Sequence, residues 1–142
     1  MKTFIRLLAM SLAFLLCGSA VSAREITLFD RTGTPVAYVD TDQEFTVFLW
    51  NGTPVAYLSH ASIFGFNGKH LGWLRKGIVR DHDGNGVGFV EGAVNMLTKL
   101  ERLKGLERLT PLRALEELEP IEPMTKDTWS STPLELFLEG SE

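Results

Sequence analysis

The side chains most able to do chemistry lie in one short segment, where Asp81, Asp83 and Asn85 alternate with a histidine and a glycine. Oxygen-bearing side chains at positions one, three and five, with glycine at six, match the opening of a calcium-binding loop. Such a loop closes with a bidentate glutamate at position twelve, but that position is Gly92 and Glu91 misses it by one. An Asp-Gly pair is also a hairpin-turn signal. A plain turn is therefore the preferred interpretation, with calcium binding as the alternative.

The histidines and one serine offer weaker signals. His60, His70 and His82 fit no zinc-ligand spacing, so we expect isolated residues of turns or of the surface. Ser59 directly precedes His60, but no Gly-x-Ser-x-Gly elbow surrounds it and no third partner is implied. The sequence therefore predicts no catalytic, cofactor-binding or metal site.

Four copies of one motif form the framework around these residues. Each copy is a glycine, two variable residues, an aliphatic, a tiny residue, an aromatic and a second aliphatic, and the copies begin at Gly33, Gly52, Gly68 and Gly84. Each glycine follows Thr, Asn or Asp, and a strand-like segment precedes each turn, which is the pattern of a β-hairpin. A lone hairpin is barely stable in water, so the four must bury one another. The sequence predicts an all-β fold of eight strands between Glu25 and Gly92, arranged as a pseudo-four-fold ring of hairpins.

The alternation of side chains along a strand sorts the motif into two faces. It predicts that the first aliphatic points inward with the aromatic of each repeat, which is Tyr38, Tyr57, Trp73 or Phe89. The tiny residue and the second aliphatic then point the other way, and the tiny residue lets strands approach closely. A second interpretation makes the four aromatics a sugar-stacking platform if their face is open to water, but a core layer is preferred.

These motifs resemble those of a known family. The segments Phe66-Asn-Gly-Lys-His-Leu-Gly-Trp73 and Asp81-His-Asp-Gly84, with the paired Gly-Thr-Pro-Val-Ala-Tyr copies, resemble the bacterial 4-fold beta flower proteins. The resemblance covers about Glu25 to Gly92 and implies the hairpin arrangement and an exported setting. It implies no activity, substrate or catalytic residue. A leucine- and proline-rich tail is also similar, although this chain has fewer prolines and more glutamates there.

Residues 1–23 have the pattern of a signal peptide. Two basic residues precede the apolar run Leu7–Cys17, and a small-residue cleavage site ends at Ala23. The apolar run is shorter than the roughly 20 residues that a spanning helix needs, and no second such run follows, so we expect no membrane span after cleavage. A lipoprotein acylated at Cys17 is the alternative, but Leu16 stands where a small residue is usual. We expect export to the periplasm or secretion.

Cleavage would leave 119 residues with no cysteine, 12 basic and 18 acidic residues, and a net charge of −6. The mature chain can then form no disulfide, so its stability must come from packing. The acidic balance argues against nucleic-acid binding, which depends on clustered Lys and Arg. We expect a small domain at 24–93, a tail at 94–124 and a C-terminal segment at 125–142.

The tail has an apolar residue at every third position. These residues are Val94, Leu97, Leu100, Leu103, Leu106, Leu109, Leu112, Leu115, Leu118, Ile121 and Met124. Polyproline II has three residues per turn and keeps such a stripe on one side, whereas an α-helix rotates it away. Local α-helix over 94–109 is the alternative. An extended tail of about 95 Å matches the roughly 90 Å girth of the domain. The leucines need a surface to cover, so the tail either forms a belt around the domain or docks on another protein or another copy.

The chain ends with a predicted short helix. Ser131 or Thr132 supplies the cap, Pro133 lies in the first turn, and Glu135 lies near the third position. Its apolar residues and Trp129 are expected to pack on the domain.

Together these patterns predict an exported structural or interaction module and no enzyme. The expected partner is an envelope or extracellular protein, or another copy bound through 94–124. Binding of glycan or peptidoglycan by the aromatic side chains is the alternative function.

Overall fold

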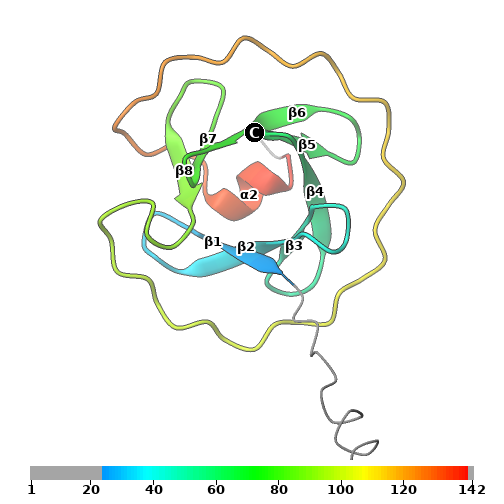
Figure 1. The fold of residues 1–142 in the computed structure, drawn as a ribbon, viewed down its shortest axis with the longest axis horizontal. Helices are drawn as coiled ribbons and strands as arrows, with labels where there is room; N and C mark the ends of the chain where they lie inside the picture. Colours follow the sequence, from blue (N-terminus) through cyan, green and yellow to red (C-terminus); the bar gives the residue numbers. More distant parts are fainter. Residues whose placement is uncertain (1–23, 141–142) are drawn as a thin grey trace, which may run out of the picture.

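The computed structural model describes residues 24–140, and these form a closed antiparallel barrel surrounded by an extended belt (Figure 1). Strands that are neighbours in sequence are neighbours in the sheet, and the barrel closes where Phe29 pairs with Phe89. The predicted all-β fold of hairpins is confirmed. The strands are β1 (Glu25–Phe29), β2 (Pro35–Asp40), β3 (Thr46–Leu49), β4 (Pro54–Ser59), β5 (Ser62–Gly65), β6 (His70–Arg75), β7 (Ile78–Arg80) and β8 (Gly86–Phe89).

A register shift at the same place in each repeat corrects the predicted faces. In the first repeat Leu28 of β1 pairs with Ala37 of β2, and Phe29 pairs with Pro35. Val36 of β2 is therefore skipped and has no partner on β1. A β-bulge of this kind interrupts the alternation of side chains along the strand. The other skipped residues are Val55, Leu71 and Val87. All four first aliphatics consequently pack against the barrel interior together with the tiny residues, and not beside the aromatics as alternation alone predicts.

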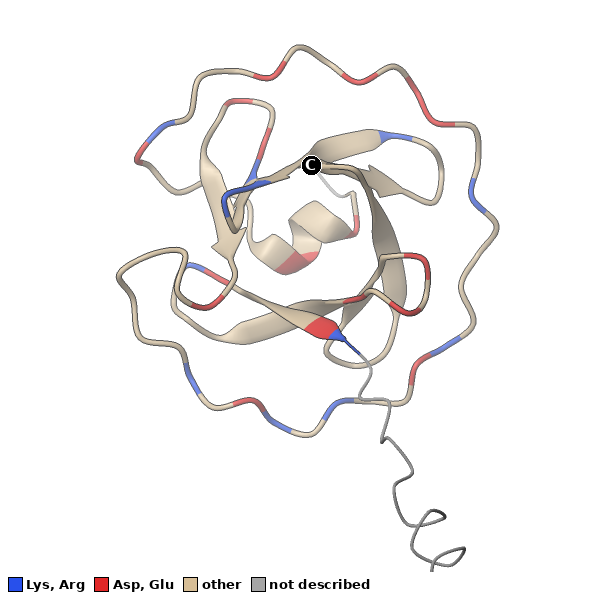
Figure 2. Ribbon diagram, viewed as in Figure 1, with Lys and Arg blue, Asp and Glu red and all other residues tan. Residues whose placement is uncertain are grey.

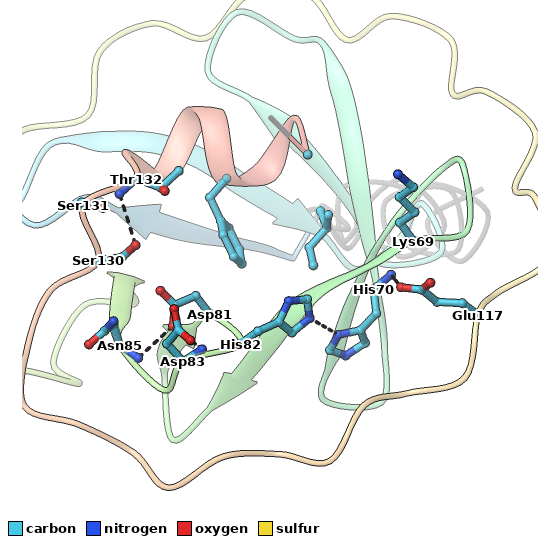
Figure 3. A pocket seen from close by; sticks show the side chains of 13 residues that line it. Lys69, His70, Asp81, His82, Asp83, Asn85, Glu117, Ser130, Ser131 and Thr132 are labelled. Carbon is cyan, nitrogen blue, oxygen red and sulfur yellow. Dashed lines mark hydrogen bonds between the residues drawn. The ribbon is translucent and has the colours of Figure 1, made fainter. Parts of the chain in front are cut away.

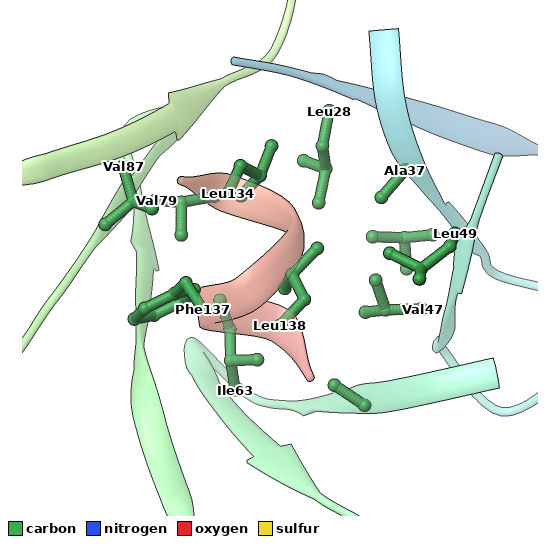
Figure 4. Packing of buried hydrophobic residues seen from close by; sticks show 12 residues of the cluster. Leu28, Ala37, Val47, Leu49, Ile63, Val79, Val87, Leu134, Phe137 and Leu138 are labelled. Atoms are coloured by element: carbon green, nitrogen blue, oxygen red, sulfur yellow. The ribbon is translucent and has the colours of Figure 1, made fainter. Parts of the chain in front are cut away.

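A short helix fills the interior of the barrel. Helix α2 (Leu134–Leu138) crosses the centre of the ring (Figures 1 and 4) and buries Leu134, Phe137 and Leu138 there. The surrounding wall consists of Leu28, Ala37, Val39, Val47, Leu49, Ala56, Ile63, Val79 and Val87. The C-terminal helix is therefore the core of the molecule rather than a cover on its surface.

The tiny residues of the motif leave the space that this helix occupies. A Cβ on Gly88 would lie 2.8 Å from a methyl carbon of Leu134, and one on Gly72 would lie 2.8 Å from the ring of Phe137. The helix also corrects the predicted cap. Its N-cap is Pro133, which makes no side-chain capping bond, while the Ser130 hydroxyl accepts a hydrogen bond from the backbone N–H of Thr132 at 3.2 Å.

Residues 94–126, called the belt below, pass around the outside of the barrel (Figure 1). The belt contains no helix or strand and follows an extended path (Figure 1). The α-helical alternative for 94–109 is therefore wrong. Within residues 24–140, no helix combines the length and the apolarity that crossing a membrane would require.

Candidate functional site

The belt is attached to the four hairpin turns at intervals of nine residues. Nine residues are three turns of a polyproline II helix, so the same side of the belt returns at every hairpin. The turn glycines accept the hydrogen bonds through their carbonyl oxygens: Lys99 N to Gly33 O at 2.8 Å, Arg108 N to Gly52 O at 2.9 Å, Glu117 N to Gly68 O at 2.9 Å and Lys126 N to Gly84 O at 3.0 Å.

These contacts give the turn glycines a second reason to be glycine. Gly52 and Gly68 have φ angles of 92° and 86°, which favour glycine. A Cβ on either residue would also collide with a belt carbonyl, that of Leu106 or Leu115. The motif glycines thus form the turns and also admit the belt.

The inner face of the belt is polar and contacts the aromatic side chains on the outside of the barrel. The hydroxyl groups of Tyr38 and Tyr57 donate to Glu107 and Glu116, each at 3.0 Å. Trp73 Nε1 donates to Glu119 at 2.7 Å. Burial, reinforced by the neighbouring carboxylate, raises the pKa of both Tyr38 and Tyr57. The belt therefore supplies an acceptor for each buried polar tip, as burial of such groups requires.

The fourth repeat has no polar tip to satisfy, because its aromatic is Phe89. Here Trp129, which follows the belt, lies with its ring 6.2 Å from that of Phe89. Tyr38, Tyr57, Trp73 and Phe89 are all at most 1 % exposed. The sugar-stacking platform predicted as an alternative is therefore wrong for these four residues, because the belt covers them.

The outer face of the belt is a continuous apolar ridge. Ten side chains, called the ridge below, are between 88 % and 98 % exposed: Leu97, Leu100, Leu103, Leu106, Leu109, Leu112, Leu115, Leu118, Ile121 and Met124. The expectation that the leucines cover the domain is wrong. The belt turns its glutamates inward because the buried Tyr and Trp tips need acceptors, and a three-residue turn then points every third side chain outward.

A cluster of three carboxylates lies between the barrel and the belt. Oxygens of Glu25, Asp40 and Glu107 lie within 4.8 Å of one another. The Lys104 ammonium forms an ion pair with Glu25 and lies 4.3 Å from the centre of the Tyr38 ring. A lysine from the belt therefore already supplies a positive charge to this cluster.

Two of the histidines form a pair that the sequence analysis missed. His70 Nδ1 lies 2.9 Å from His82 Nε2 (Figure 3). The other ring nitrogen, His70 Nε2, lies 3.1 Å from the hydroxyl of Ser62. Both ring nitrogens of His70 therefore have a partner, one in His82 and the other in Ser62. Burial, and then the neighbouring His82, lower the pKa of His70. The Ser62 side chain is buried, which does not favour a nucleophilic role.

The remaining sequence candidates have structural explanations. Asp81 Oδ1 accepts from the backbone N–H of Asp83 at 3.0 Å and of Asn85 at 2.9 Å, which stabilises the turn. Asp30 does the same in the first hairpin. His60 lies at the turn between β4 and β5 with a φ of 57° and takes no part in the histidine pair. The preferred plain turn at Asp81 thus has a direct structural basis.

The histidine pair of His70 and His82 lies at a cavity of about 840 Å³, which is also lined by residues 130–132 before α2 and by Gly140 after it. Its lining includes Lys69, Asp81, Asp83, Glu117 and Ser130 (Figure 3). Three carboxylates and one ammonium group line it, so the charge of its lining is net negative.

A protein-family model described as "4-fold beta flower protein" matches residues 26–138 of the chain. The chain belongs to the 4-fold beta flower family. The match covers the barrel, the belt and α2 of this beta flower protein, and so extends the resemblance past Gly92. No curated protein and no solved structure is significantly similar to it.

The signal for the histidine pair in this beta flower protein is a difference between its repeats. Pro35 and Pro54 begin the second strand in the first two hairpins, and His70 stands at the same register position in the third. A polar ring that replaces a proline at a buried position needs partners, so aligning the repeats would have singled out His70.

The histidine pair predicts a pH dependence of stability. Because the pKa of His70 is lowered on folding, its contribution to stability is complete above the usual histidine pKa of about 6.5. It is lost as the pH falls below that value and through the lower pKa of the folded protein. We expect the free energy of unfolding, measured by urea denaturation, to decrease from about pH 7.5 to about pH 5.5. The variant His70→Gln should flatten this slope, whereas His60→Gln should retain it. Equal slopes in the two variants would contradict the assignment.

Proposed function

We propose that this protein is exported and acts as a non-catalytic interaction module that contacts protein surfaces through the ridge. The observation that supports the proposal is the near-complete exposure of ten apolar side chains in one row. Burying apolar surface contributes about 25 cal/mol per Å², and burying a whole leucine side chain contributes about 2–3 kcal/mol. Dividing the second figure by the first gives about 100 Å² of apolar surface for each ridge side chain. The whole ridge then presents on the order of 1,000 Å², more than the largest apolar patch of an ordinary monomer.

The construction of the belt supports this role. The polar residues between the ridge residues make the contacts with the barrel. The ridge can therefore contact another molecule without disturbing the fold. From Leu97 to Met124, the apolar residue at every third position is almost fully exposed and so adds little to burial within the chain. Burial against a partner gives that pattern a physical purpose.

Photo-crosslinking in cells tests the proposal. A photoreactive phenylalanine analogue at Leu109, on the ridge, is expected to give covalent protein adducts. The same analogue at Leu136, which is 44 % exposed on α2, is the matched control and should give none. The proposal fails if the ridge position gives no adduct or if both positions give the same adducts.

Mass spectrometry of the recovered protein tests export. It should find Arg24 as the first residue, and a retained leader would contradict export.

A further inference from the structure

The charges along the belt are divided between two arcs (Figure 2). Residues 99–113, the basic arc, carry five Lys or Arg and two Glu, whereas residues 114–122, the acidic arc, carry four Glu and no basic residue. Ridge leucines run through both arcs. The belt thus presents two apolar surfaces of opposite charge on one molecule.

Part of the charge in each arc is cancelled by the barrel, because Lys104 pairs with Glu25, Arg113 with Glu44 and Glu122 with Arg75. The other three cations of the basic arc and the other three glutamates of the acidic arc form no ion pair among residues 24–140. In the acidic arc, Glu116, Glu117 and Glu119 accept hydrogen bonds from a tyrosine, a backbone N–H and a tryptophan, all of which are neutral. In the basic arc, Arg102 and Arg108 are exposed, and neither takes part in the ion pairs formed among residues 24–140. Opposite potentials therefore remain available to orient a partner.

The shape of the ridge limits what can cover it. It follows the convex rim of the molecule (Figure 1), so two such rims meet over a short arc. Three ridge residues per copy correspond to about 300 Å², well below the roughly 800 Å² per partner of a stable interface. The ridge is also one side chain wide, whereas a bilayer core is about 30 Å thick. These dimensions favour weak, repeated contacts between proteins over membrane insertion.

We infer that copies of this chain associate head to tail, with the basic arc of one belt against the acidic arc of the next. This inference rests on the proposed function and names a second copy as the partner. The two contacting surfaces differ, so the contact is heterologous, and a pair of copies keeps a free acidic arc on one copy and a free basic arc on the other. Contacts of this kind extend into rings or open chains. The leucines become buried in each contact, and the opposite charges determine which arcs pair.

A mixing experiment with purified full-length mature protein tests the pairing. Arg102→Glu/Arg108→Glu reverses the basic arc, and Leu115→Ser/Leu118→Ser removes the apolar contact of the acidic arc. Each variant alone should sediment as a monomer at concentrations where the wild type associates. Their equimolar mixture should form a one-to-one dimer and nothing larger, because only one intact pair of arcs remains.

The controls separate the pairing from general effects of charge. Arg31→Glu/Lys76→Glu changes the net charge equally outside the belt and should associate like the wild type. At about 1 M NaCl, where the Debye length is about 3 Å, wild-type association should weaken. A wild type that is monomeric at every concentration, or association that survives the basic-arc reversal, would overturn the inference. If Leu109 gives adducts but the wild type is monomeric, the proposed function stands and the pairing of copies is overturned. If there are neither adducts nor association, both the proposed function and the pairing are overturned.

Discussion

Replacing Gly72 by alanine is expected to lower the free energy of unfolding by about 3 kcal/mol, the upper range for an overpacked core. The added methyl group would collide with the backbone carbonyl of Arg80 and lie 2.8 Å from Phe137. A carbonyl in a closed barrel cannot move aside, because its strand is hydrogen-bonded on both edges. The change should therefore weaken both barrel closure and the seat of the helix.

Gly86→Ala is the matched control for this prediction. A Cβ on Gly86 would meet the Trp129 ring at 3.4 Å, an ordinary contact. Where a strand tolerates the methyl group, replacing glycine reduces the entropy of the unfolded chain, and the change is neutral or stabilises by up to about 1 kcal/mol. Urea denaturation of both variants measures the difference. Equal losses would show that the penalty comes from glycine replacement in general and not from the contact with Arg80.

The hairpin architecture could be predicted because the motif itself specifies it. Each turn glycine adopts positive φ, from 77° at Gly33 to 92° at Gly52, as the Thr-Gly, Asn-Gly and Asp-Gly pairs indicate. Pro35 and Pro54 begin their strands, where a missing N–H is tolerated. Turn chemistry of this kind depends on neighbouring residues alone, so one sequence is enough to recognise it.

The faces of the strands could not be predicted from alternation, because each repeat contains a bulge. One skipped residue, such as Val36, places two successive side chains on the same side. Periodicity then assigns the first aliphatic to the wrong face. The four tiny residues were the available clue, since a helix inside a barrel requires small side chains on the wall, as at Gly88 beside Leu134.

The direction of the ridge also escaped prediction, for an energetic reason. A row of leucines normally indicates a buried face, and the extended path of the belt was correctly anticipated. The orientation instead depends on the acceptors needed by buried tips such as those of Tyr38 and Trp73. Glu107 and Glu116 are nine residues apart, which is the interval at which the belt contacts successive hairpins. This spacing is the sequence feature that indicates which side of the belt faces the barrel.

Two leucine-to-alanine changes should separate the two roles of leucine in this chain. Leu138 is fully buried inside the barrel, whereas Leu109 on the ridge is 96 % exposed. Leu138→Ala removes methyl groups from a packed core and should cost about 2–5 kcal/mol of unfolding free energy. Leu109→Ala should change stability by less than about 0.5 kcal/mol. Chemical denaturation at a protein concentration low enough to keep the chain monomeric measures both.

The same pair connects stability to interaction. If Leu109 contributes only when a partner covers the ridge, Leu109→Ala should weaken association while leaving the unfolding of the monomer unchanged. Leu138→Ala should do the reverse at temperatures where the barrel remains folded. A large loss of monomer stability on changing Leu109 would mean that the ridge packs within the chain after all.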